Sequence, residues 1–156
     1  MEDERESKIA IKQAIMKQCL QKQSDLITTA REAMKEAQDT ANEQDNAIEE
    51  KFESFKAQMQ QDRDMYAKKL DEHLSNMAVL KRISSTMVNQ TVTQGSVVVT
   101  SAQNYFISIS IGSITVEGKN YFAISSQSPI YEAMAEKKKG DTFEFRGQKI
   151  TLLDVF

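Results

Sequence analysis

Apolar residues recur at intervals of three and four positions along the first half of the chain, and they alternate with polar residues along the second half. One set of apolar positions in the first half comprises Ile15, Cys19, Leu26, Ala30, Ala33, Ala37 and Ala41. A second set shares one heptad frame and comprises Ile48, Phe52, Phe55, Met59, Tyr66, Met77, Leu80, Ile83 and Met87. Such seams predict two helices that pack against each other as a coiled coil.

The distribution of Gly and Pro supports long helices. The first 94 residues contain neither, whereas all five glycines and the single proline follow. One uninterrupted helix of this length would extend over ~125 Å. An antiparallel hairpin is therefore the favoured interpretation, with its turn at about 41–47, where Asn42, Asp45 and Asn46 can satisfy backbone groups locally. A dimer of single long helices is the alternative.

The second half reads as short strands separated by Gly, Asn or charged residues. The apolar runs are "SVVVTS", "YFISISI", "SITVEG", "NYFAIS", "TFEFRG" and "KITLLDVF". We expect a hairpin around Glu117 to Asn120. Between the fourth and fifth runs, Ser128 is a candidate N-cap and Pro129 suits a first helical position, so one helix is expected from Pro129 to about Lys138. The pattern predicts an α+β protein: a helical hairpin over 1–90, then a small antiparallel sheet with one short helix over 95–156.

Composition narrows the class of protein. The net charge of −3 gives no reason to expect general or sequence-specific binding to duplex DNA, and no apolar run approaches the ~20 residues that a membrane span needs. Cys19 is the only cysteine, so no intrachain disulfide forms, and it fits the seam as a small apolar residue. His73, the only histidine, is interpreted as a polar residue of the second seam. A cytoplasmic protein is expected.

Carboxylates concentrate in the middle of the helical half. The stretch from Asp39 to Ser54 contains six acidic residues and one base, Lys51. Magnesium keeps several waters and prefers few protein ligands, so carboxylates on a turn are suited to completing the shell of an ion held elsewhere. The alternative is that solvated helix ends and turns are often acidic. The candidate metal-facing residues are Glu43, Asp45, Glu49 and Glu50.

The segment Ser128 to Phe145, "SPIYEAMAEKKKGDTFEF", resembles the C-terminal motif of the bacterial Gre transcript-cleavage factors. That motif runs S-P-L-x-x-A-L-L-G-K-K-x-G-D and is followed by a strand. Seven residues match it: Ser128, Pro129, Ala133, Lys137, Lys138, Gly140 and Asp141. The order of the halves, a long helical hairpin and then a small β-rich domain, is also similar. The specific motif covers about 18 residues of the chain.

The resemblance implies an FKBP-like second domain that docks on RNA polymerase at its secondary channel. The hairpin would then present its acidic tip to the catalytic Mg²⁺ of the polymerase, close to the nascent RNA. Gre factors carry D-x-x-E-N-A-E-Y at the tip, and "DNAIEEKF" aligns with its second half from Asp45. Asn42 then replaces the first acidic residue and Glu49 replaces the tyrosine. The docking residues implied are Ser128, Pro129, Lys137, Lys138, Gly140 and Asp141.

The functional prediction is therefore a polymerase-binding elongation factor that modulates transcript cleavage or pausing. It would not be an enzyme itself, and it would bind no cofactor tightly beyond sharing the polymerase Mg²⁺. One alternative is a coiled-coil adaptor or holdase whose partner is another protein. Another is an enzyme related to the FKBP prolyl isomerases. The basic residues Lys137, Lys138 and Lys139 suit contact with an acidic surface, and they equally suit a helix end that complements the helix dipole.

Overall fold

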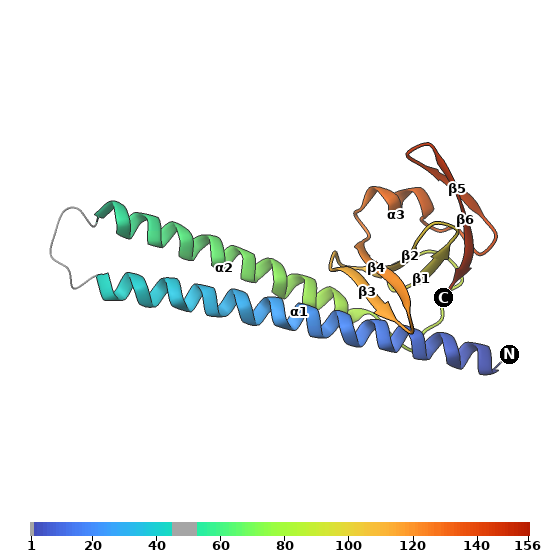
Figure 1. Cartoon of the computed structure of the whole chain (residues 1–156), viewed down its shortest axis with the longest axis horizontal. Coiled ribbons are helices and arrows are strands. Elements are labelled where there is room, and N and C mark those ends of the chain that lie inside the picture. Colours follow the sequence, from blue (N-terminus) through green and yellow to red (C-terminus); the bar gives the residue numbers. More distant parts are fainter. Residues whose placement is uncertain (1, 45–52) are drawn as a thin grey trace. The chain divides into compact units, whose positions relative to one another are not determined.

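The computed structural model describes residues 2–44 and 53–156, and it confirms the α+β class. The helices are α1 (Glu2–Gln44), α2 (Glu53–Arg82) and α3 (Pro129–Met134). The strands are β1 (Val97–Thr100), β2 (Asn104–Ser108), β3 (Gly112–Val116), β4 (Lys119–Ser125), β5 (Thr142–Phe145) and β6 (Gln148–Val155) (Figure 1). No helix in the described part of the chain is both long and apolar enough to cross a membrane.

The chain forms two compact units. One unit comprises Met1–Lys22 together with Ala78–Phe156, and the other comprises Gln23–Met77. The first unit thus joins the beginning of α1 and the end of α2 to the sheet. The predicted division into a domain of residues 1–90 and a domain of residues 95–156 stays a prediction. It concerns which parts fold independently, whereas the two units are defined by spatial contacts.

In the unit Gln23–Met77, the helices α1 and α2 run side by side in opposite directions (Figure 1). The side-chain amide of Gln23 donates a 2.8 Å hydrogen bond to the backbone carbonyl of His73. Fifteen positions further along α1, Gln38 accepts a 2.8 Å hydrogen bond from the guanidinium of Arg63, ten positions earlier on α2. These pairs show opposite chain directions, so the intramolecular antiparallel hairpin is confirmed.

The predicted turn at 41–47 is partly wrong. The residues Ala41–Gln44 belong to α1, so the turn does not begin at Ala41. Ala, Glu and Gln are strong helix formers, and they extend the helix past Asn42, which was expected to lie in the turn. The remainder of the predicted turn, 45–47, lies outside the described residues.

The packing seam of α1 also differs from the prediction at one position. Leu26 was placed on the seam, but 42% of it is exposed, whereas Gln23 and Ile27 on either side are buried. Ile27 and Ala30 pack with Leu70 of α2. A helix turns every 3.6 residues, so the buried stripe shifts to Ile27 instead of keeping the step to Leu26.

The six strands form one sheet in the order β3-β4-β2-β1-β6-β5. The expected hairpin joins β3 to β4 through Glu117 and Gly118, whose φ angles of 52° and 78° fit a type I′ turn. The prediction of a wholly antiparallel sheet is wrong, because β2 and β4 are parallel neighbours. After β2 the chain forms β3 at the edge of the sheet and then β4, which lies between β3 and β2. Because β4 is antiparallel to β3, it runs in the same direction as β2.

Both faces of the sheet are buried. One face packs against α3 in a core of nine buried residues: Val92, Val98, Tyr105, Ile107, Met134, Phe143, Ile150, Leu152 and Val155. On β2, Phe106 points to the opposite face and is also fully buried. The first part of α1 crosses the sheet, because Lys8 pairs with Asp154 of β6 at 3.2 Å and Gln18 donates to the carbonyl of Thr115 of β3 at 2.7 Å.

Candidate partner-docking site

The predicted docking segment begins at the start of α3. Ser128 is the N-cap residue with extended backbone angles, and Pro129 follows as the first helical residue, as predicted. The Ser128 hydroxyl does not cap the helix, however. It donates a 2.8 Å hydrogen bond back to the carbonyl of Ser125, while the Ser128 carbonyl accepts the first helical bond from the N–H of Glu132. Ser128 therefore fixes the turn that leads from β4 into α3.

The helix α3 ends at Met134, earlier than the predicted end near Lys138. Glu136 has a φ angle of 64°, which turns the chain out of the helix. Its N–H then donates to the carbonyl of Val92, and the Val92 N–H donates to the carbonyl of Lys137 at 2.8 Å. These bonds to a segment more than forty positions earlier replace the last helical turn, and local sequence could not predict them.

A tight turn follows at the end of the motif. The Asp141 carboxylate accepts a 3.0 Å hydrogen bond from the backbone N–H of Lys138, and the Asp141 N–H donates to the Lys138 carbonyl. Gly140 has a φ of 92°, a conformation that side chains strongly disfavour. Its N–H and the Asp141 carbonyl both bond to the backbone of Leu152 in β6. Gly140 and Asp141 therefore shape the segment and dock it on the sheet.

The lysines of the motif carry its positive charge, and two of them place that charge at the surface. Lys138 and Lys139 are exposed and Lys137 is half-buried. In the described residues, none of the three forms an ion pair. The segment thus divides into a scaffold (Ser128, Pro129, Gly140 and Asp141) and a basic surface that can contact an acidic partner.

The predicted acidic tip falls largely on residues that the structure does not describe. Asp45, Glu49 and Glu50 lie outside the described residues, and so does the side chain of Glu43. Elsewhere, the described residues hold no cluster of three or more His, Cys, Asp or Glu side chains that could bind a metal ion. The metal-facing role of the tip stays a prediction.

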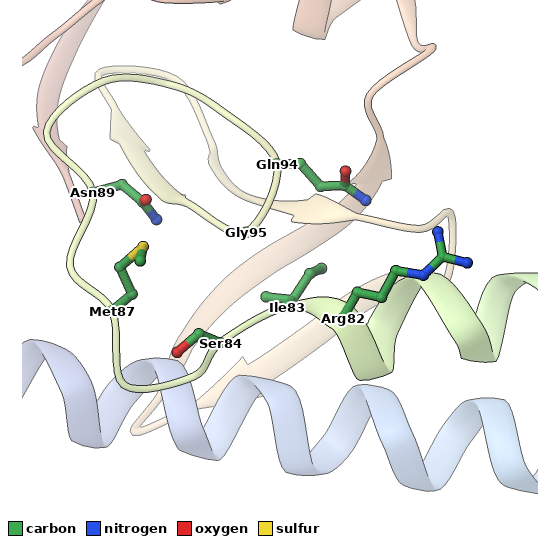
Figure 2. Close-up of a pocket in the computed structure, with 7 residues that line it drawn as sticks. All are labelled: Arg82, Ile83, Ser84, Met87, Asn89, Gln94 and Gly95. Carbon is green, nitrogen blue, oxygen red and sulfur yellow. The ribbon is translucent and has the colours of Figure 1, made fainter.

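Sequence reasoning missed a pocket at the end of α2. Its cavity of about 240 Å³ is lined by Arg82, Ile83, Ser84, Met87, Asn89, Gln94 and Gly95. Figure 2 shows Arg82 and Gln94 on one side of it and Met87 and Asn89 on the other. Met87 is 59% exposed, so the pocket offers an apolar contact beside a guanidinium and two amides. This combination suits an anchoring side chain of a protein partner.

Lys12 of α1 forms a hydrogen bond to the loop that carries this pocket. Lys12 is fully buried, and its ammonium donates a 2.7 Å hydrogen bond to the backbone carbonyl of Met87. Burial lowers the pKa of Lys12 from 10.5 to about 8, because the charged form loses its hydration. No sequence pattern predicted this contact, since a lysine in a helix is usually exposed.

Cys19 and His73 are the only cysteine and the only histidine of the chain, and the surroundings of neither one resemble those of a catalytic residue. Cys19 is fully buried, and burial raises the pKa of its thiol to about 12, although the charge of Lys22 opposes the shift. A thiol of this kind is a poor nucleophile. His73 is half-buried on α2, and its backbone carbonyl accepts the Gln23 amide. Gln23 is therefore a buried polar position of the α1 seam.

The architecture defines an α+β protein in which a helical hairpin precedes a six-stranded sheet. No family model matches the chain, and no curated protein matches it. Among solved structures, the transcription factor Gfh1 is similar over 87% of this chain and 92% of that chain, with 15% identity and a TM-score of 0.37. Thermus aquaticus Gfh1 is similar over 86% and 92%, with 17% identity and a TM-score of 0.34. At these values neither structure assigns a family or a function.

Proposed function

We propose that this protein is an accessory elongation factor of RNA polymerase, of the Gre type. Its sheet-containing unit docks on the polymerase, and its helical hairpin carries the acidic tip toward the catalytic Mg²⁺ of that enzyme. The factor modulates transcript cleavage or pausing and has no catalytic centre of its own. The observation that carries the proposal is the occurrence of an antiparallel hairpin and the Ser128–Asp141 motif in one chain.

The proposed role requires an extended hairpin, and the helices of this hairpin are long. The helix α2 has 30 residues, which corresponds to ~45 Å at 1.5 Å per residue. The pairs Gln23–His73 and Arg63–Gln38 hold the two helices together at separate levels.

The chemistry of the tip rests on Glu43 and Asp45, with Glu49 and Glu50 as further candidates. Carboxylates that complete the shell of a magnesium ion can help to hold a water for attack on a phosphodiester. The tip differs from the Gre pattern at Asn42 and Glu49, so the effect on the polymerase can be stimulation or inhibition of cleavage. Stimulation and inhibition both require that the tip of the hairpin lies close to the catalytic Mg²⁺ of the polymerase.

Docking is proposed for the surface around the motif residues Ser128, Pro129, Lys137, Lys138, Gly140 and Asp141. Four of these residues set the backbone path, as described above. The two lysines supply positive charge without an intramolecular ion pair among the described residues. An acidic polymerase surface is the expected contact, because unpaired charges steer and orient association.

The test begins with co-purification of the full chain with RNA polymerase and continues with a cleavage assay on backtracked complexes. The tip variant Glu43→Ala with Asp45→Ala should still bind but should lose the effect on cleavage. The control Glu32→Ala with Glu36→Ala removes the same charge from exposed positions of α1 and should behave like the wild type. Equal behaviour of the two variants would show that the acidity only solvates the hairpin.

A second pair of variants tests docking. Lys137→Glu with Lys138→Glu should weaken polymerase binding, whereas Lys68→Glu with Lys69→Glu on the exposed surface of α2 should not. Wild-type protein that fails to bind polymerase at all contradicts the proposal.

One observation favours a second candidate function, a coiled-coil adaptor or holdase. Among its described residues, the unit Gln23–Met77 exposes three large apolar side chains: Leu26 at 42%, Met65 at 55% and Leu74 at 39%. Such residues can contact apolar segments of other proteins. Light scattering of reduced insulin distinguishes the two functions. If the present protein suppresses the aggregation of insulin and does not bind polymerase, the holdase function is supported.

A further inference from the structure

The two edges of the sheet are treated differently. At one edge, β3, two side chains of α1 reach the backbone. Gln18 donates to the Thr115 carbonyl at 2.7 Å, and Lys22 donates to the Ser113 carbonyl at 2.8 Å. Side-chain donors at an edge block the addition of a further strand, because they occupy the acceptors that a new strand needs.

The register of the hairpins shows which backbone groups face outward. The β3–β4 hairpin closes with the pair Val116–Lys119 around a type I′ turn, so β3 directs Val116 and Ile114 toward β4 and directs Thr115 and Ser113 outward. The hydrogen bonds from α1 go to the carbonyls of these two outward residues. The outward direction of Thr115 and Ser113 therefore agrees with the observed contacts.

Inward and outward backbone groups alternate in the same way at the opposite edge, β5. The β5–β6 hairpin closes with the pair Phe145–Gln148 around Arg146 and Gly147, whose φ angles are 51° and 78°. Phe145 and Phe143 therefore bond to β6, and the N–H and C=O groups of Thr142 and Glu144 face outward. Both residues are exposed, and no hydrogen bond from another described element reaches their backbone.

Positive charge surrounds this open edge. Lys138 and Lys139 precede β5, and Arg146 and Lys149 lie at its far end, all of them exposed. None of the four forms an ion pair within the described part of the chain. The one acidic residue of the strand, Glu144, lies directly across from Lys149 in the ladder.

The charge decides which occupant fits the edge. A second copy of the same edge would bring two sets of cations together, so self-pairing is disfavoured. A nucleic acid could use the cations, but it has no repeat of backbone donors and acceptors that matches Thr142 and Glu144. An extended polypeptide with acidic side chains satisfies both features.

We infer that the β5 edge binds an extended acidic segment of another protein, which adds to the sheet as a further strand. The backbone of Thr142 and Glu144 pairs with the segment, and the flanking Lys138, Lys139, Arg146 and Lys149 contact its carboxylates. This surface shares Lys138 with the proposed polymerase-docking surface, but its backbone pairing involves neither the hairpin tip nor the Ser128 turn, and the peptide test below contains no polymerase.

The test uses the full chain and a fluorescein-labelled peptide in which glutamate alternates with valine. Binding is followed by fluorescence anisotropy, and amide exchange is followed by NMR. The peptide should bind and should protect the N–H groups of Thr142 and Glu144 from exchange. A peptide in which lysine replaces each glutamate should not bind, and neither should the acidic peptide with alternate backbone nitrogens methylated.

Substitutions in β5 separate backbone pairing from charge. Glu144→Pro removes an outward N–H and leaves the ladder to β6 intact, since proline is tolerated on edge strands. It should weaken binding at least about tenfold, whereas the matched Glu144→Thr keeps the N–H and should bind as well as the wild type. If Glu144→Pro does not fold, the charge variants carry the test.

The charge variants are Lys138→Glu with Lys139→Glu, and the control is Lys68→Glu with Lys69→Glu on α2. The first pair should weaken peptide binding about tenfold and the control should not change it. The inference would be overturned by equal binding of acidic and basic peptides, by protection at amides other than those of β5, or by binding of single-stranded DNA at β5 in competition with the peptide. Lack of binding at a peptide concentration of about 1 mM would overturn it as well.

Discussion

The ammonium of Lys12 donates a 2.7 Å hydrogen bond to the backbone carbonyl of Met87, which is 75 positions away in the sequence. Lys12 is fully buried, whereas the Met87 side chain is 59% exposed. The bond ties the first part of α1 to the loop between α2 and β1. The pocket beside Met87 is built on that loop, so a buried cation helps to set the shape of an exposed surface.

Lys12 is expected to make stability depend on pH. Its pKa falls from 10.5 in the unfolded chain to about 8 in the folded protein, so between these values the unfolded state binds more protons. The contribution of Lys12 to stability should therefore rise with pH over this window, by up to about 3 kcal/mol, while the raised pKa of Cys19 acts in the opposite direction above pH 9. In Lys12→Met this rise should be absent. Urea unfolding followed by circular dichroism measures both proteins, with the exposed Lys68→Met as control. Parallel pH profiles for wild type and Lys12→Met would contradict the prediction.

Cys19 is expected to be unreactive in the folded protein. Burial raises the pKa of its thiol from 9.0 to about 12, so almost no thiolate forms at neutral pH. A disulfide reagent such as Ellman's should label it only as the chain unfolds, and the labelling rate should increase with urea. Labelling of the native protein as fast as that of a free thiol would show that the site is accessible.

Two glycines with similar backbone angles are expected to differ in their tolerance to alanine. Gly95 and Gly118 have φ angles of 95° and 78°. A Cβ at Gly95 would lie 3.1 Å from Cγ2 of Ile83, whereas one at Gly118 would meet nothing within 4 Å. Gly118→Ala should cost about 1 kcal/mol from backbone strain, and Gly95→Ala should cost roughly 1 kcal/mol more. Urea unfolding of the two variants measures this difference, and equal losses would mean that Ile83 moves aside freely.

Gln23 is expected to favour specificity of pairing over stability. It is 1% exposed and its amide bonds to the His73 carbonyl. Gln23→Leu removes the buried amide but keeps most of the volume, so the free energy of unfolding should stay within about 1 kcal/mol of the wild type. Gln23→Ala leaves a cavity and should cost about 2 kcal/mol. Thermal and urea unfolding give both values. A loss for Gln23→Leu as large as that for Gln23→Ala would show that the hydrogen bond itself stabilises the hairpin.

Local signals in the sequence predicted the main elements. The absence of Gly and Pro before Gly95 and the apolar seams predicted two antiparallel helices, which the structure contains. The turn at Glu117 and Gly118 was found because Gly adopts positive φ angles at no steric cost. Pro129 marked the beginning of α3 for the same kind of local reason, since its fixed φ suits a first helical position.

The candidate site was predictable only in part. The motif around Ser128 and Asp141 was visible as a pattern of residue types, and its lysines were recognised as a possible contact surface. The pocket beside Met87 was not visible, because it is formed by a loop that reads as a polar linker. The open edge of β5 depends on the order of the strands, and no local pattern encodes that order.

The sequence by itself determined the type and most of the limits of the elements, because propensity, capping and hydrophobic period act over a few neighbouring residues. Only the tertiary structure decided that α3 ends at Met134, that β2 and β4 are parallel, and that Lys12 is buried. Each of these depends on contacts between residues far apart in the chain. Val92 bonds to the segment after α3, β3 occupies an edge, and α1 packs on the sheet, so the energies that decide them arise only when distant segments meet.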